Sequence, residues 1–306
     1  MALLKDYVLG PDLFKIYVRS LRKEVEPARF DIFGFADDHQ LLKTFLPIFQ
    51  VTALQNDIQY CFELISKWMN KYFLCLNASK TKILIIVPPS LRGKIVIHGT
   101  FINDKCVRFV SSAKNLGVIL DDELSFSAHI TKLVKSCFFT IRNLSKIKSY
   151  LTFEQLRTVV YGAIFSRLDY CNSLFYGINS VLLGKLQSVQ NSAVRLLRKK
   201  NGLCRISTDD FIRKCHWLRV KARILFKLCL IVHKCLHGIA PGSLQVMLTY
   251  NTSSRTMKLN EPPYHKSCGD RRFGRIAPKL WNLLPSDIRT EVKTDVFKRQ
   301  LKPYIR

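Results

Sequence analysis

The chain has 306 residues, of which 48% are hydrophobic and 23% are charged, so it can bury the cores of two ordinary domains. Lysine and arginine number 49 against 22 acidic residues, which gives a formal net charge of +27. A polyanion is therefore the natural partner. Nucleic acid and an anionic membrane surface both qualify, and we rank a merely well-solvated basic protein below nucleic acid. No uncharged apolar stretch reaches about 18 residues, which excludes a membrane-spanning segment.

The ten cysteines are scattered and mostly sit inside apolar runs. The first residues, MALLKDYVLGPDLF, lack the cleavable apolar core of a signal peptide. We therefore expect an intracellular protein of the cytoplasm and nucleus, whose reduced thiols pack as small hydrophobic residues.

The first 127 residues mix helix and strand patterns. A helical pattern occupies residues 8–20, and residues 31–42 read as strand, acidic turn and strand, which predicts a β-hairpin. Apolar residues recur at helical spacing over residues 51–73. Short strands are then expected at three places, the last of them followed by an acidic turn at 121–123; they are residues 83–87, 95–97 and 115–120.

The pattern changes near residue 128 and becomes helical almost throughout as far as Lys200. Residues 129–200 hold twelve lysines and arginines against two acidic residues. After a loop at 201–208, the pattern predicts a helix over 209–238 and a flexible connector near 249–270. A short helical segment over 276–302 then ends the pattern. The chain is therefore predicted to be α+β, with an all-helical second part.

The segment Phe35-Ala36-Asp37-Asp38 is the sharpest local feature of the sequence. Two adjacent acids at a hairpin tip repel each other, and hairpin turns ordinarily prefer Asn-Gly or Asp-Gly. A divalent cation such as Mg²⁺ removes that repulsion, because it takes carboxylate oxygens and keeps water ligands for substrate phosphates. Taken alone, the four residues favour a solvated turn that contains Asp-Asp, because short motifs often match by chance.

Six segments follow one another in an order and spacing that a known family shares. They are Leu9-Gly10-Pro11 with Phe14 and Tyr17; Phe35-Ala36-Asp37-Asp38; Trp68-Met69 followed by Leu76-Asn77-Ala78-Ser79-Lys80-Thr81-Lys82; Asn115-Leu116-Gly117-Val118 with Leu120-Asp121; His216-Trp217-Leu218 with Val220 to Ile224; and Ala277-Pro278 with Leu280-Trp281-Asn282 and Leu284-Pro285. In these segments the chain resembles the C-terminal part of reverse transcriptases from non-LTR (LINE-type, jockey-like) retrotransposons, over roughly residues 7–302.

The resemblance implies a fold and an activity. Residues 1–127 would be a partial right-hand polymerase palm, an antiparallel sheet with helices; residues 128–200 an all-helical thumb; and residues 201–306 a C-terminal helical region. Family enzymes copy an RNA template from a DNA primer into DNA. Asp37 and Asp38 would be catalytic ligands of Mg²⁺ or Mn²⁺.

Further site residues follow from the same resemblance. Lys80 would lie near the phosphates of the incoming nucleotide, although a solvated surface lysine explains it equally well. Leu116 and Gly117 would form the turn that grips the primer, which is compatible with ordinary hairpin chemistry. The thumb would bind the nucleic-acid backbone through basic residues on one helix, and the same helix would bury its opposite face; the basic residues are Arg195, Arg198, Lys199 and Lys200.

The chain departs from the family pattern in three ways. Its residues include no match to the fingers or to the first metal-binding aspartate, so we expect little or no polymerase activity from these residues alone and foresee a missing N-terminal polymerase portion. His39 stands where the family usually has Thr. The spacing His233-x-Cys235-x-His237 suggests zinc, but it spreads the three side chains around a helix, so we interpret them as helix-face and core residues.

Two alternatives to a polymerase fragment stay open. One is a non-catalytic nucleic-acid-binding module, which would not need Asp37 and Asp38. The other is an enzyme completed by a second polypeptide that supplies the fingers and covers an apolar palm surface.

Overall fold

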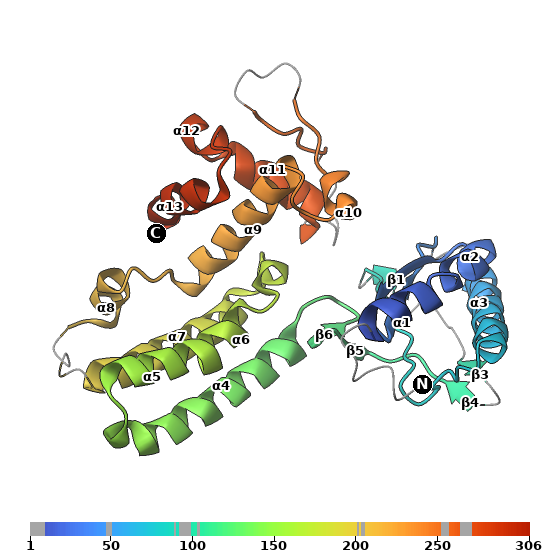
Figure 1. Ribbon diagram of the computed structural model, residues 1–306, viewed down its shortest axis with the longest axis horizontal. Helices are drawn as coiled ribbons and strands as arrows, with labels where there is room; N and C mark the ends of the chain where they lie inside the picture. The colour runs from blue at the N-terminus through green and yellow to red at the C-terminus, as the bar shows by residue number, and fades with distance from the viewer. Residues whose placement is uncertain are drawn as a thin grey trace. The chain divides into compact units, whose positions relative to one another are not determined.

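The computed structural model describes residues 10–46, 51–88, 90–91, 99–102, 105–200, 202, 206–251, 257–263 and 271–306. The chain divides into two units, Met1–Leu124 and Ser125–Arg306, which we call the N-terminal unit and the helical unit. Most of the structure is helical, and its strands form small antiparallel two-stranded sheets, which confirms an α+β composition (Figure 1).

The N-terminal unit alternates short helices and hairpins. Its helices are α1 (Gly10–Val18), α2 (Leu21–Val25), the 3-10 turn η2 (Glu26–Ala28) and α3 (Val51–Lys71). Its strands pair as three hairpins, β1 (Asp31–Phe35) with β2 (Asp38–Leu42), β3 (Thr100–Ile102) with β4 (Lys105–Val107), and β5 (Ser112–Asn115) with β6 (Val118–Asp121).

Helix α3 organises the core of the N-terminal unit. Buried residues recur along it every three or four positions, which gives one apolar face; they are Leu54, Ile58, Cys61, Phe62, Ile65 and Trp68. Ile32 and Leu41 of the first hairpin pack against this core, as do Ala78 and Ile83 of the segment that follows α3. Segments far apart in sequence therefore share one hydrophobic support.

Two strand predictions for this unit were wrong. Residues 83–87 form no strand; Ile83 makes only an isolated parallel bridge with Phe109. Residues 115–120 are not one strand but the centre of the β5–β6 hairpin, because Leu116 and Gly117 both adopt positive φ and reverse the chain. The predicted strand at 95–97 lies outside the described residues.

The helical unit contains three long helices and several short ones. Its elements are α4 (Ser127–Ile147), the 3-10 turn η4 (Lys148–Tyr150), α5 (Phe153–Val160), the π-helical turn η5 (Tyr161–Phe165), α6 (Ser166–Asp169), the 3-10 turn η6 (Asn172–Phe175), α7 (Ser180–Lys200), α8 (Thr208–Lys214), α9 (Val220–Leu236), α10 (Gly242–Gln245), α11 (Phe273–Asn282), α12 (Ser286–Arg289) and α13 (Thr294–Ile305).

Helices α4 and α7 pack side by side along their length (Figure 1). The buried residues of α4 are spaced by seven, at Ile130, Cys137 and Leu144, which gives a narrow apolar stripe. Helix α5 begins with a capping box, in which Thr152 Oγ1 accepts from Gln155 N at 3.2 Å and Gln155 Oε1 accepts from Thr152 N at 2.8 Å. The prediction of helix throughout 128–200 is confirmed, in several pieces.

The helix predicted over 209–238 is broken into α8 and α9 by the residues between them. His216 takes a positive φ of 53°, which ends α8, and Trp217 and Leu218 turn into the core. Buried Gln190 donates to the Leu218 carbonyl at 2.8 Å, and Gln187 Oε1 accepts from Val220 N at 3.0 Å. Helix α7 thus holds the start of α9 through two amide side chains.

The last helices enclose a second core around Trp281 and Phe297. Trp281 Nε1 donates to the Met257 carbonyl at 3.0 Å, and Asn282 exchanges two 2.9 Å hydrogen bonds with the backbone of Leu259. Residues 257–259, which belong to the predicted connector, are therefore anchored to α11. No helix in the described part of the chain is long and apolar enough to cross a membrane.

The cysteines differ between the two units. Cys75 and Cys106 of the N-terminal unit are exposed, whereas Cys61 is buried there and Cys137, Cys229 and Cys235 are buried in the helical unit. Burial raises the pKa of Cys61 to about 11 and that of Cys229 to about 12, because a thiolate is poorly solvated in an apolar interior. All these thiols are free.

Candidate functional site

The β1–β2 hairpin closes through a two-residue turn that contains the first of the two acids. Phe35 pairs with Asp38, so Ala36 and Asp37 form the turn. Ala36 has a φ of 53°, in the left-handed region that costs a non-glycine residue about 1–2 kcal/mol. Glycine is the usual choice at such a position, so the turn carries backbone strain beside its carboxylates.

The two strands alternate their side chains between an inner and an outer face. Ile32 and Leu41 face the core, while Asp38 lies exposed on the outer face beside its cross-strand partner Phe35. Phe33 and Phe35 expose 52% and 68% of their surface. The outer face therefore presents carboxylate and aromatic groups together, on a sheet of only two strands.

Lys43 ties the end of this hairpin to the helices. Its Nζ lies 2.6 Å from Asp57 Oδ2 on α3 and donates to the Ala28 carbonyl at 2.9 Å. The same Nζ lies 4.9 Å from the centre of the Phe30 ring, and the side chain is only 15% exposed. This half-buried cation fixes the strand that follows the acidic turn.

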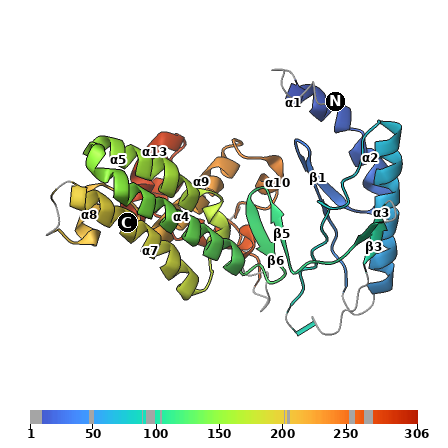
Figure 2. The same cartoon turned by 90° about the horizontal axis from the view of Figure 1, so that it is seen from below.

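A side-chain hydrogen bond joins the acidic hairpin to the β5–β6 hairpin. Asn115 Nδ2 donates to Gln40 Oε1 at 2.8 Å. The ribbons of β1 and β5, which belong to the two hairpins, are labelled near each other in Figure 2. Gln40 lies two residues after Asp38, and Asn115 directly precedes the Leu116-Gly117 turn. The sequence segments expected to hold the metal and the primer are therefore brought together within the N-terminal unit.

Lys80 lies in a tight turn organised by Asn77. The Asn77 side-chain oxygen accepts from Ser79 Oγ at 2.6 Å and from Lys80 N at 3.2 Å, and its carbonyl accepts from Thr81 Oγ1 at 2.9 Å. The Lys80 side chain is exposed, and its Nζ makes no ion pair with the described residues. The structure fixes its backbone without joining it to Asp37 or Asp38.

The acidic turn meets part of the requirement for a magnesium site. Asp37 and Asp38 supply two adjacent, exposed carboxylates, which suits an ion that keeps several water ligands. Within the ranges described above, no group of three or more His, Cys, Asp and Glu side chains gathers as a metal site. Among the described residues, the pair thus has no third ligand side chain of this kind grouped with it.

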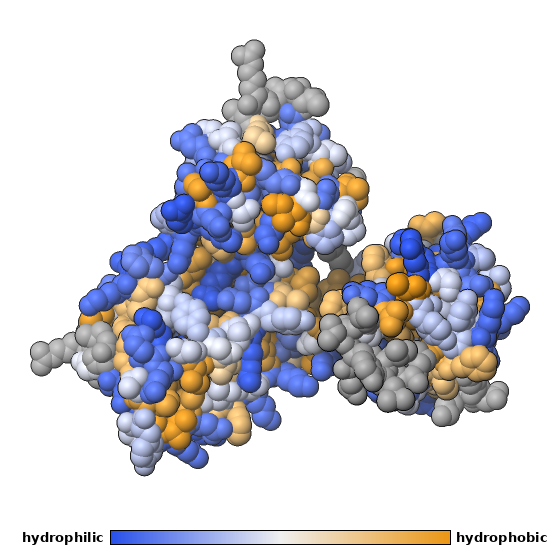
Figure 3. All heavy atoms as spheres, in the orientation of Figure 1, coloured by the Kyte–Doolittle hydropathy of each residue, from blue (hydrophilic) through white to orange (hydrophobic). Residues whose placement is uncertain are grey.

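The four basic residues predicted to bind nucleic acid are used differently by the fold. Arg195 and Lys199 lie four residues apart on the exposed side of α7. Arg198 turns toward α8, where its Nη1 donates to Thr208 Oγ1 at 3.2 Å, and Lys200 Nζ donates to the Ser149 carbonyl at 3.3 Å. Over the helical unit, the face seen in Figure 3 mixes hydrophilic residues with apolar patches.

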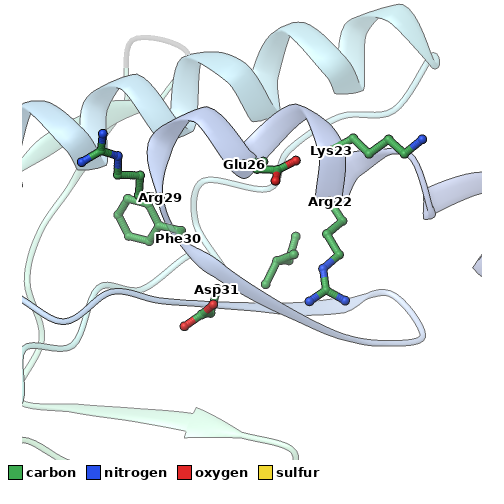
Figure 4. Close-up of a pocket in the computed structure, with 7 residues that line it drawn as sticks. Arg22, Lys23, Glu26, Arg29, Phe30 and Asp31 are labelled. Atoms are coloured by element: carbon green, nitrogen blue, oxygen red, sulfur yellow. The ribbon is translucent and has the colours of Figure 1, made fainter. Parts of the chain in front are cut away.

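A hollow of about 460 Å³ lies between α2, η2 and the start of β1. Arg22 reaches into it from α2 toward the strand, and Arg29 flanks it on the other side (Figure 4). Lys23 adds a third cation to the lining, while Glu26 and Asp31 add two carboxylates. The hollow lies at the opposite end of the hairpin from the acidic turn and is not part of the candidate metal site.

The zinc interpretation of His233, Cys235 and His237 is not supported by their contacts. His233 is buried, with its Nε2 2.9 Å from the Glu291 carbonyl and its ring stacked between His237 and Phe297. Burial lowers the pKa of His233 and raises that of Cys235, as expected for core residues.

Several residues that shape these sites carry no signal in the sequence. Lys43, Gln40 and Asn115 hold the acidic hairpin, and Arg223 forms a two-pronged ion pair with Asp169 that links α9 to α6. Each is an ordinary polar residue whose partner lies far away along the chain, so neither spacing nor composition could single it out.

Comparison of the chain with protein-family models, with curated proteins and with solved structures finds no match.

Proposed function

We propose that this chain is the C-terminal part of an RNA-directed DNA polymerase of the non-LTR retrotransposon type. Residues 1–127 would belong to the palm, 128–200 to the thumb and 201–306 to the C-terminal region, and the partners would be an RNA template and a DNA primer. The observation that carries the proposal is the Asn115–Gln40 hydrogen bond, because it joins the acidic hairpin to the hairpin with the Leu116-Gly117 turn. The segments that the resemblance assigns to the metal site and to the primer grip are therefore neighbours in space.

The acidic turn would hold Mg²⁺ or Mn²⁺ through Asp37 and Asp38. When bound, such an ion neutralises phosphate charge during nucleotide transfer. The chain's own residues would position the two carboxylates, because the contacts of Lys43 and Gln40 hold the hairpin that carries them. Lys80 would add a cation for the nucleotide phosphates, in a backbone turn fixed by Asn77.

The helical unit would bind the sugar–phosphate backbone of the template–primer duplex. Arg195 and Lys199 would be its exposed contacts on α7, although the Arg195 guanidinium also donates to the Asn191 carbonyl at 3.3 Å and to Ser192 Oγ at 3.4 Å within the same helix. Arg198 and Lys200 donate to Thr208 and to the Ser149 carbonyl. Binding of this kind weakens steeply with salt, because each neutralised phosphate releases counterions.

A binding experiment tests the thumb assignment. Fluorescence anisotropy with a labelled RNA–DNA hybrid would compare the wild type with Arg195→Ala/Lys199→Ala over a range of salt concentrations. We expect the double variant to bind more weakly and to lower the log–log salt slope by about 0.9 for each lost phosphate contact. The matched control is Lys227→Ala/Lys279→Ala, which removes two exposed cations from α9 and α11 of the same unit.

A metal experiment tests the acidic turn. Mn²⁺ binding, measured by electron paramagnetic resonance in the presence of a nucleoside triphosphate, should be lost in Asp37→Asn/Asp38→Asn. It should persist in Glu24→Gln/Glu63→Gln, which removes two exposed acids from α2 and α3. Equal Mn²⁺ binding by both double variants would refute the metal assignment.

A non-catalytic nucleic-acid-binding module is the second candidate. The absence of a third carboxylate near Asp37 and Asp38 among the described residues favours it. Primer extension decides between the two: we expect the purified 306-residue protein to bind a template–primer without extending it. Robust extension that depends on Asp37 would contradict this expectation. Activity that appears only when a separate fingers polypeptide is added would favour completion in trans, with Phe33 and Phe35 at the junction.

A further inference from the structure

One end of the helical unit brings together residues from two helices. Helix α4 ends at Ile147 and continues into η4, and Lys200, the last residue of α7, donates to the Ser149 carbonyl of η4 at 3.3 Å. The C-terminal end of α7 therefore lies beside η4 (Figure 1).

Tyr150 closes η4 and is 87% exposed, more than any other aromatic residue that the structure describes in the helical unit. Its ring and hydroxyl make no contact with another described aromatic ring or polar group. The backbone beneath it is fixed, because Leu151 N donates to the Lys148 carbonyl at 3.4 Å and the Thr152 capping box follows at once. A large aromatic ring thus stands in water on a hydrogen-bonded backbone turn, and a binding partner would bury its apolar faces.

The charge around this ring is positive. Lys146 and Lys148 precede Tyr150 on α4 and η4, and Lys199 and Lys200 come from α7. The nearby acid in sequence, Glu154, is paired with Arg157 at 2.7 Å. An exposed ring on a basic segment, with Lys200 held beside η4, suits a ligand that has flat, apolar faces joined by phosphates.

We propose that Tyr150 is a stacking platform for an unpaired base of a nucleic acid whose phosphates are bound by the cations at this end of the helical unit. The inference rests on the proposed nucleic-acid-binding function and adds a preference for a single-stranded segment next to the duplex. A duplex base pair is already stacked on both faces, whereas an unpaired base can stack on an exposed ring without regard to its sequence.

The experiment compares three labelled ligands by anisotropy: a blunt RNA–DNA hybrid, the same hybrid with a single-stranded overhang, and the hybrid with an abasic overhang. The variants are Tyr150→Ala, Tyr150→Phe and the control Tyr304→Ala, which removes another exposed tyrosine. We expect Tyr150→Ala to weaken binding of the overhang ligand about ten-fold while leaving the blunt hybrid unchanged. Tyr150→Phe and Tyr304→Ala should bind like the wild type.

The abasic overhang gives a second readout that needs no substitution. The wild type should bind it as weakly as Tyr150→Ala binds the normal overhang, because both pairs lack the same stack. The inference is overturned if Tyr150→Ala binds all three ligands like the wild type, or if this variant weakens binding of the blunt hybrid as much as binding of the overhang ligand. It is also overturned if an acidic peptide competes with the overhang ligand and binds Tyr150→Ala more weakly than the wild type.

The two proposals can fail separately. If the wild type binds none of the nucleic acids, the proposed function fails and this inference falls with it. If Arg195→Ala/Lys199→Ala weakens binding but Tyr150→Ala does not, the thumb assignment stands and only the stacking platform is wrong.

Discussion

The two units differ in how completely each buries its apolar surface. Almost all of the largest fully buried side chains belong to the helical unit, the exception being Leu21; they are Trp281, Phe165, Phe175, Phe211, Phe297, Ile130, Leu156, Ile164, Leu186 and Leu197. The N-terminal unit contributes only Leu21 to that set, and its acidic hairpin exposes Phe33 and Phe35. The helical unit is thus stabilised mainly by packing, whereas the hairpin adds a few polar contacts to the packing of Ile32 and Leu41.

This difference follows from the elements themselves. Long amphipathic helices such as α4 and α7 cover each other's apolar stripes. A two-stranded sheet can cover only one of its faces and is marginally stable alone. In a larger sheet, further strands would hold such a hairpin in place. In the N-terminal unit, the contacts of Lys43 and the Asn115–Gln40 hydrogen bond do so.

The largest effect is expected in the core of the helical unit. Phe165→Ala should lower the free energy of unfolding by about 3–5 kcal/mol, because the ring is fully buried against Trp217 and its loss leaves a cavity. Hydrogen exchange of peptides from each unit, measured with denaturant unfolding, would locate the loss. Phe33→Ala, a change of the same size on the exposed hairpin face, should shift stability by no more than about 0.5 kcal/mol. Equal losses would mean that the two units do not differ as described.

An intermediate effect is expected where polar contacts hold the hairpin. Lys43→Met removes the ion pair with Asp57 and the bond to the Ala28 carbonyl while keeping much of the side-chain volume. We expect a loss of about 1.5–3 kcal/mol in the stability of the N-terminal unit, the range for hydrogen bonds to a charged group. Lys67→Met on α3, where the lysine is exposed, is the control. A hairpin that exchanges hydrogen no faster in Lys43→Met would show that packing alone holds it.

A smaller effect of opposite sign is expected at the acidic turn. Ala36→Gly relieves the left-handed φ of 53° and should raise the melting temperature of the N-terminal unit, by an amount that corresponds to up to about 1 kcal/mol. Ala53→Gly in α3 should do the reverse, since glycine weakens a helix interior. Destabilisation by Ala36→Gly would show that the turn does not carry the strain inferred for it.

The smallest effect is expected from pH. Burial lowers the pKa of His233 below its ordinary value of 6.5, and neighbouring His237 adds to the decrease while Glu291 opposes it. As pH falls below 6.5, the unfolded imidazole binds a proton that the folded one does not, so the helical unit loses stability. His129 acts in the same direction.

His233→Gln should therefore flatten, without abolishing, the decrease in melting temperature between pH 7.5 and pH 5.5, two conditions on either side of the ordinary value. His216→Gln, at an exposed position, serves as the comparison. An unchanged pH dependence in His233→Gln would exclude this residue as the source.

Periodicity predicted the helices correctly wherever apolar residues recur along one face. The acidic hairpin was also predicted, because its apolar strands flank polar turn residues. The break between α8 and α9 was missed because 209–214 and 220–236 are both helical in pattern, and only the burial of Trp217 and the contacts of Gln187 and Gln190 separate them. The strand pattern over 115–120 missed the β5–β6 turn, because Leu116 is an unusual residue at positive φ, whereas the resemblance placed a turn at Leu116-Gly117.

The sequence could predict which segments hold the site residues, but not how those residues are arranged in space. Sequence order pointed to Asp37, Asp38, Lys80, Leu116 and Gly117, but their spatial relation depends on contacts between residues far apart, such as Asn115 with Gln40. The basic residues of α7 were predicted as a group, yet Arg198 and Lys200 point toward different protein partners, which spacing alone cannot reveal.

The uneven distribution of thiols offers a direct chemical readout of the two units. Only the thiolate reacts quickly with a maleimide, and burial both shields a thiol and raises its pKa. A maleimide dye at neutral pH should therefore attach at exposed Cys75 and Cys106, and much more slowly at Cys137, Cys229 and Cys235. Among these five cysteines, the two of the N-terminal unit would carry the dye in the native protein, and delayed labelling of the three buried cysteines would time the opening of the helical unit.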